Sequence, residues 1–188
     1  MLLFDQAGPA NTADVIQQVC TAAGRQPVGT IVVASNTGAT ARQLLDALDR
    51  HSLSVRVVVV THVCEFKPGI INELPDSERQ SLESRGCRIV TAAHALSAGE
   101  RALNRKFGGI GPLELVAHTL RMFGQGTKVA LEIALMARDA GAAAPDQPLI
   151  AIGGSGRGAD TALLLTPGTS ASLLDSRIHD VICKPSLL

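Results

Sequence analysis

Small hydroxyl and amide side chains surround a glycine in the segment SNTGAT, which follows the β-branched run TIVVA. Gly38 has no Cβ, so the backbone N–H groups beside it can approach an anion closely. A helix beginning there would add unpaired N–H groups and the positive end of its dipole. We therefore interpret the segment as a phosphate-binding turn, with an ordinary capped strand-to-helix turn as the alternative. The expected binding residues are Ser35, Asn36, Thr37, Gly38 and Thr40.

A second glycine-rich segment, GGSGRGAD, follows the apolar run PLIAI. Its glycines can wrap a ligand closely, and Arg157 adds a permanent charge for phosphate or carboxylate. It also contains G-x-G-x-x-A, but the following TALLLTP is too short and too β-branched for the helix that a dinucleotide fingerprint should open. The alternative interpretation is a glycine-rich hairpin tip. The candidate binding residues are Gly153, Gly154, Ser155, Gly156, Arg157 and Gly158.

Titratable side chains follow a third apolar run in the segment THVCE. We expect Thr61 and His62 to line the same binding site. A nucleophile pair of His62 and Cys64 is conceivable, but we favour an ordinary pocket-lining histidine. Two side chains at positions i and i+2 are too few ligands for a metal, so we predict no metal site.

Strands and helices alternate along the chain, and these elements must position the three segments. Apolar runs predict strands over residues 30–34, 55–61, 87–92, 148–154 and 161–167, with a further short strand over 180–185. Helical patterns cover residues 13–24, 39–51, 75–86, 97–107, 112–123 and 128–141. This alternation predicts a three-layer α/β/α fold with a mixed, mostly parallel sheet of about five strands. Ligands of such sheets bind beyond the carboxyl ends of the parallel strands, where all three segments fall.

One connection is too short for a parallel crossover, which needs a dozen or more residues. Only eight residues lie between Ile152 and Thr161. We therefore expect the strand over residues 161–167 to run antiparallel to its predecessor, at an edge of the sheet.

Several residues are expected to end helices. Asn11 or Thr12 should cap the first helix, and Gly24 should close it. Ser97 and Glu100 have the spacing of a capping box, and Thr127 should cap the helix over residues 128–141.

Composition limits the classes of function. The 188 residues fit a single domain spanning 1–188, with zero formal net charge and 2% aromatic residues. Nucleic-acid binding is not expected, because basic patches and stacking rings are missing. The longest strand-like run is too short for a membrane span, and MLLFDQAG does not resemble a signal peptide. We expect a cytoplasmic protein whose four cysteines are small, buried hydrophobic residues.

These motifs together resemble a known family. VVASNTGATAR and IAIGGSGRGADTALLL are similar to the two effector-binding loops of the C-terminal α/β domain of pyruvate kinase. TAAHALSAGERALNRKFGGI and LRMFGQGTKVALEIALMARDAG resemble stand-alone proteins of the same family. The resemblance covers nearly the whole chain. It implies a mixed sheet with an antiparallel fifth strand.

Some of the stand-alone proteins are reported with FMN, so the resemblance implies FMN as the ligand. Its phosphate would lie at the SNTGAT turn, and the Gly153–Gly158 loop would cover the rest of it. Thr61, His62, Phe66 and Phe107 would surround the ring. Pyruvate kinase carries out its reaction in a barrel domain, which a chain of 188 residues does not contain. We therefore expect no pyruvate kinase activity.

The functional hypothesis is a protein that binds a small phosphorylated ligand, with FMN as the first candidate. The alternatives are a flavin-dependent oxidoreductase and a regulatory sensor of a sugar phosphate or nucleotide. Whether a reaction is catalysed stays open at this point. Edge strands and the helices over residues 112–140 offer a face for a homo-oligomer, but the sequence does not fix the oligomeric state.

Overall fold

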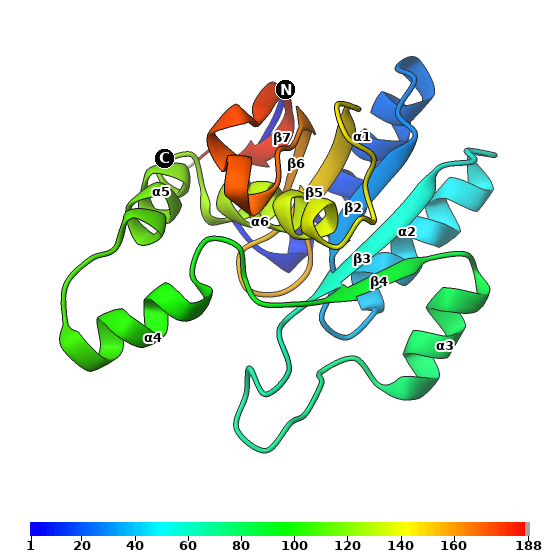
Figure 1. The fold of residues 1–188 in the computed structure, drawn as a ribbon. Helices are drawn as coiled ribbons and strands as arrows, with labels where there is room; N and C mark the ends of the chain where they lie inside the picture. Colours follow the sequence, from blue (N-terminus) through cyan, green and yellow to red (C-terminus); the bar gives the residue numbers. More distant parts are fainter. Residues whose placement is uncertain (187–188) are drawn as a thin grey trace.

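The computed structural model describes residues 1–186 and shows strands and helices in alternation (Figure 1). Within these residues the strands are β1 Leu2–Phe4, β2 Thr30–Ala34, β3 Arg56–Thr61, β4 Arg88–Thr91, β5 Leu149–Gly153, β6 Thr161–Thr166 and β7 Arg177–Pro185. The α-helices are α1 Thr12–Arg25, α2 Ala39–Arg50, α3 Asp76–Ser84, α4 Ala98–Phe107, α5 Pro112–Arg121 and α6 Gln125–Asp139. Two 3-10 turns, Pro9–Asn11 and Ser170–Asp175, complete the fold.

The strands form one mixed sheet in the order β1-β7-β6-β5-β2-β3-β4. β2 pairs in parallel with both β3 and β5, and β4 continues the parallel part beside β3. β6 runs antiparallel to β5 and β7, as the short connection predicted. The mostly parallel α/β sheet is confirmed.

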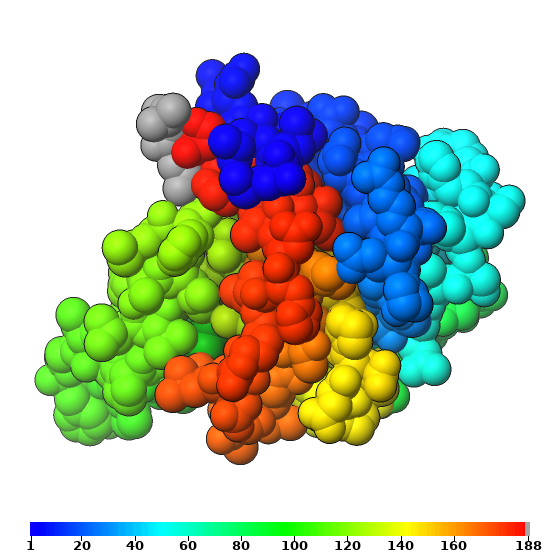
Figure 2. Space-filling model, turned by 90° about the horizontal axis from the view of Figure 1, so that it is seen from above, coloured from blue at the N-terminus to red at the C-terminus, as the bar shows by residue number. Residues whose placement is uncertain are grey.

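The predicted edge position of β6 is wrong, and the sheet has seven strands among the described residues rather than about five. β7 pairs with the free side of β6, and β1 pairs with β7 in parallel. β1 has three residues, of which only Phe4 is buried, so it carries almost no periodic signal. Figure 2 shows the N-terminal residues lying against the C-terminal strand.

Helices cover both faces of the sheet, which confirms the three layers. Alternate side chains of a strand point to opposite faces. Accordingly, Ile31 and Val33 pack with α1 and α2, whereas Val32 packs with α6. Leu82 of α3 joins the first layer, and Ala117 of α5 joins the second. Because both faces of the sheet are buried, the sequence of β3 is an almost continuous run of valines.

Gly24 and Thr127 do not cap helices as predicted, and the capping box of Ser97 and Glu100 does not form, although Ser97 is the N-cap of α4. Gly24 lies inside α1, which ends at Arg25. Thr127 lies inside α6, and its hydroxyl donates to the carbonyl of Phe123 at 3.1 Å. Ser97 makes no capping hydrogen bond, because Glu100 instead accepts the backbone N–H groups that begin α5. At Gly24 and Thr127 the helix extends beyond the predicted end. At Ser97 the partner that the capping box requires, Glu100, is bonded to α5 instead.

α4 and α5 extend from the body of the molecule, as Figure 1 shows. α4 has no buried residue, and Ala117 is the one buried residue of α5. In the part of the chain that the structure describes, no helix combines the length and the apolar character that crossing a membrane requires.

Candidate functional site

A cavity of about 900 Å³ lies at the carboxyl ends of β2, β3 and β5. Its size falls within the range of small-molecule and cofactor sites. The helices α1, α2 and α6 all begin beside it, so three positive dipole ends face one space. The predicted site residues that line it are Ser35, Asn36, Thr37, Thr40, Thr61, His62, Gly154, Gly156, Arg157 and Gly158.

The SNTGAT turn begins α2 in a geometry that leaves donors available. Gly38 is the N-cap with φ 86°, a left-handed conformation that favours glycine. Ser35 Oγ accepts the N–H of Ala41 at 3.3 Å. Among the described residues, the N–H groups of Ala39 and Thr40 have no acceptor, as is usual for the first turn of a helix. The turn therefore offers two backbone donors beside its hydroxyl groups.

Gly38 itself does not line the cavity. A Cβ at this position would lie 2.4 Å from the Glu78 side chain of α3. Glycine at this position allows the positive φ and leaves room for α3 to approach. It contributes to the cavity only indirectly, by permitting this turn.

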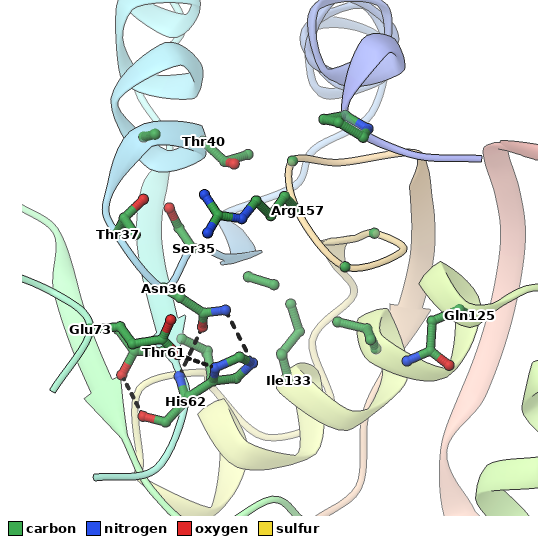
Figure 3. A pocket seen from close by; sticks show the side chains of 18 of the residues that line it. Ser35, Asn36, Thr37, Thr40, Thr61, His62, Glu73, Gln125, Ile133 and Arg157 are labelled. Atoms are coloured by element: carbon green, nitrogen blue, oxygen red, sulfur yellow. Dashed lines mark hydrogen bonds and ion pairs between the residues drawn. The ribbon is translucent and has the colours of Figure 1, made fainter. Parts of the chain in front are cut away.

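Arg157 projects from the β5–β6 loop toward Ser35 and Thr37 (Figure 3). Its side chain is exposed, and it has no ion pair with any described residue. The loop is held by buried Asp160, whose carboxylate accepts the N–H groups of Gly8 at 2.9 Å and Ser155 at 3.1 Å. An unpaired guanidinium thus faces the hydroxyl groups of the turn.

Two other predicted residues, Gly153 and Gly158, have structural roles. A Cβ on Gly153 would lie 2.3 Å from the carbonyl oxygen of Gly126, so this glycine lets α6 approach β5. Gly158 has φ 66° and no room for a Cβ beside Pro9. Gly153 and Ser155 do not line the cavity. The loop leads into the strand β6 and not into a helix, which excludes the dinucleotide fingerprint.

His62 is fixed by hydrogen bonds on both ring nitrogens. Asn36 Oδ1 accepts the backbone N–H of His62 at 2.9 Å, which turns the amide NH₂ toward His62 Nε2 at 3.1 Å. Nε2 is therefore the acceptor, and the proton lies on Nδ1, which donates to Glu73 Oε1 at 2.7 Å. Figure 3 shows this chain of contacts along the cavity wall. Whenever the ring is uncharged, this arrangement selects the tautomer with the proton on Nδ1.

Glu73 stays ionised in this network. Burial would raise its pKa, but hydrogen bonds from Lys67 and His62 outweigh burial and hold the pKa of Glu73 below its usual value. Lys67 also forms an ion pair with Glu73. No short pattern pointed to Glu73, because it lies in the loop after β3, eleven residues from His62.

Aromatic and basic groups form the rest of the wall. The ring of Phe66 lies 3.9 Å from that of His62 and 5.4 Å from that of His94, centroid to centroid. Burial lowers the pKa of His94, so this imidazole stays neutral at pH 7. The basic side chains Arg101, Arg121 and Lys128 also line the cavity, and sequence reasoning missed them. Their positions depend on how α4 packs against α5 and how α5 packs against α6.

Some predicted site residues lie elsewhere. Phe107 is 74% exposed on α4 and does not line the cavity. Cys64 is exposed, against the prediction for the cysteines, and no hydrogen bond joins it to His62 in the described part of the chain. Residues 1–186 contain no cluster of three potential metal ligands.

The chain matches a known protein family. The model of the pyruvate kinase alpha/beta domain family matches residues 13–165. The matched part runs from α1 to β6 and includes the SNTGAT turn, His62 and the β5–β6 loop.

Proposed function

The chain belongs to the pyruvate kinase alpha/beta domain family, and from this premise we propose that it binds a phosphorylated ligand, FMN foremost, at the carboxyl ends of the parallel strands. The family match covers most of the chain, including both loops that carry the proposal.

The observation that carries the proposal is the meeting of the SNTGAT turn with Arg157. Two free backbone donors, the hydroxyl groups of Thr37 and Thr40, and an unpaired guanidinium face the same space. Charge-assisted hydrogen bonds to an anion are among the strongest that proteins make. The α2 dipole adds to them, because phosphate groups are stabilised at helix N-termini.

FMN fits the remaining walls of the cavity. Apolar side chains of Val60, Ile133 and Met136 line it, as does the ring of Phe66. A flat, aromatic ligand finds both apolar contact and a stacking partner there. When bound, FMN supplies redox chemistry, while the residues of this chain bind it, orient it and exclude water.

We propose binding and not phosphoryl transfer. The two carboxylates in the cavity wall, Glu73 and Glu132, are each in an ion pair with a lysine, Lys67 and Lys128 respectively. Neither is free to hold a metal ion beside a transferred phosphate, as phosphoryl transfer requires.

A flavin-dependent oxidoreductase is the second candidate, and His62 favours it. The ring of His62 lies against the cavity in a single tautomer, held by Asn36 and Glu73. A histidine fixed in this way can hold a substrate or a proton at a defined position.

The test is a visible absorbance spectrum of the purified protein, taken before and after FMN is added and the excess removed by gel filtration. A retained flavin band supports the proposal. Bleaching of that band by NADH or NADPH without air would support the oxidoreductase. If no band is retained, FMN is the wrong ligand. Thermal unfolding with a panel of sugar phosphates and nucleotides would then identify a ligand by its stabilisation.

A further inference from the structure

Lys128 is a buried lysine in the wall of the cavity. The chain has four lysines, and Lys128 is the one that is buried, at 4% exposure. It lies near the start of α6 and lines the cavity together with Val129, Ile133 and Met136 of the same helix. Figure 3 shows Ile133 on this wall. A primary amine therefore borders a space that is large enough for a small molecule and has apolar side chains beside it.

Glu132 is the partner of this amine. Its Oε2 forms an ion pair with Lys128 Nζ, and its Oε1 accepts the N–H of Leu96 at 3.1 Å. The second bond fixes the segment after β4 against α6, and this segment carries His94. His94 lines the same cavity, and the charge of Glu132 acts on it. One buried carboxylate is thus placed to take a proton from Lys128.

The surroundings of Lys128 favour the uncharged amine more than water does. Burial lowers the pKa of Lys128, and the charges of Arg121 and Arg101 lower it further, whereas the charge and hydrogen bond of Glu132 oppose both effects. Desolvation and a neighbouring cation are the two means by which proteins activate lysines as nucleophiles. Both act on Lys128, and its ion-pair partner is also a proton acceptor.

Stability alone explains this pair poorly. Transferring two charges out of water costs free energy, and a buried ion pair gives little net stability relative to apolar side chains of similar size. The other buried positions of α6 include Ala130, Ile133 and Ala134, which pack in an apolar core. Two apolar residues at positions 128 and 132 would continue that core. The pair therefore calls for a role in the cavity that it borders.

We propose that Lys128 forms a Schiff base with a small aldehyde or ketone that enters the cavity. The ammonium group first gives a proton to Glu132. The nitrogen lone pair then attacks the carbonyl carbon, and a proton moves from nitrogen to the carbonyl oxygen to give a carbinolamine. Glu132 returns its proton to the hydroxyl group, water leaves, and a protonated C=N bond forms beside the ionised carboxylate. Schiff-base formation goes beyond the binding function proposed above and does not require FMN.

Reductive alkylation tests the proposal on the full chain. The protein is incubated at pH 7 with a low concentration of propanal and sodium cyanoborohydride, which traps Schiff bases as propylamines. Peptide mapping by mass spectrometry gives the rate at each lysine, with exposed Lys106 as the internal reference. The same reaction in urea removes the effect of the fold. Lys128→Gln, which keeps a hydrogen-bond donor for Glu132, is compared with Lys106→Gln after circular dichroism has checked that both variants fold.

We expect native Lys128 to react about tenfold or more faster than Lys106, because a larger fraction of it is free amine. The difference should disappear in urea. Lys128→Gln should lose the fast reaction, and Lys106→Gln should keep it. If native Lys128 reacts no faster than Lys106, or if its advantage persists in urea, the proposal is overturned, whether or not the variants fold. Fast reaction of Lys128 in a protein that retains no FMN would keep this proposal and overturn FMN as the ligand.

Discussion

Asn36 is bonded twice to His62, through the backbone N–H at 2.9 Å and the ring Nε2 at 3.1 Å. The two residues follow β2 and β3, so this pair ties together the carboxyl ends of neighbouring strands. The SNTGAT turn and His62 are therefore positioned relative to each other by one amide.

This pair predicts the tautomer of His62. With Asn36 in place, neutral His62 should carry its proton on Nδ1, because Nε2 accepts from the amide. Long-range ¹H–¹⁵N NMR of the imidazole at about pH 8 distinguishes the two tautomers. Asn36→Ala should leave the proton on Nδ1, because ionised Glu73 still accepts it. It should lower the free energy of unfolding by about 1–2 kcal/mol, since two partly buried hydrogen bonds are lost. An Nε2–H signal in the unchanged protein would contradict the assignment.

Arg157 predicts the strength of phosphate binding. Arg157→Gln should weaken FMN binding about tenfold or more, because a hydrogen bond to a charged group is lost. The side chain is exposed and has no partner within residues 1–186, so the melting temperature should not change. Fluorescence titration of FMN gives the affinity, with Arg25→Gln at the exposed end of α1 as the matched control. Equal affinities in the two variants would place the phosphate elsewhere.

We expect the Asp160 carboxylate to stabilise the β5–β6 loop. Its carboxylate accepts from Gly8, Ser155 and the hydroxyl of Thr161, and it is fully buried. Asp160→Asn places an NH₂ group against these donors, so the free energy of unfolding should fall by roughly 2–4 kcal/mol. Urea unfolding measures the loss, and Asp175→Asn, on an exposed turn, should change it by less than about 0.5 kcal/mol.

We expect the folded protein to lose stability in mild acid because of His94. Burial lowers the pKa of His94, and the charges of His62, Lys128 and Arg101 add to this effect, while Glu132 opposes it. Below about pH 6.5 the unfolded chain therefore binds a proton at this position that the folded chain does not. The free energy of unfolding should decrease as pH falls, by at most about 1.4 kcal/mol per pH unit for this one proton.

Urea unfolding at a series of pH values between 7.5 and 5 tests the effect of His94. His94→Gln should flatten the curve relative to the unchanged protein, whereas His118→Gln, on an exposed surface of α5, should leave its slope as it was. Equal slopes in all three proteins would rule out this role for His94.

We expect the four cysteines to differ in how fast a thiol reagent labels them. Burial raises the pKa of Cys87 to about 11 and that of Cys183 to about 12, and it also raises the pKa of Cys20. Thiolates are the reactive form, so exposed Cys64 alone should react quickly with a thiol reagent. Cys64→Ser should abolish fast labelling of the native protein, and unfolding in urea should expose the remaining thiols.

The sequence predicted the parallel core well, because its signals are local. The strand over residues 30–34 has the predicted bounds. The length of one loop was enough to predict that β6 runs antiparallel to β5. Ligands of such sheets bind beyond the carboxyl ends of the parallel strands, and this rule correctly predicted that the SNTGAT turn, His62 and Arg157 lie at one cavity. Each of these inferences needs only a few adjacent residues.

Contacts between distant segments could not be predicted in the same way. β1 pairs with β7 from the opposite end of the chain, and Asp160 reaches Gly8 across 152 positions. Lys128 and Glu132 have the i, i+4 spacing of a solvent-exposed pair but are buried. Their burial depends on the packing of α6 against the sheet, which no short pattern encodes.

The reversed direction of β6 has a consequence for how the family can diversify. β5 and β6 form a hairpin, so the loop that carries Arg157 begins and ends at the same edge of the sheet. Residues can be inserted or exchanged at such a tip without moving any strand, provided that Asp160 still anchors the base. The residues at this tip, Arg157 among them, can therefore change in evolution or by engineering while the parallel part of the sheet stays as it is.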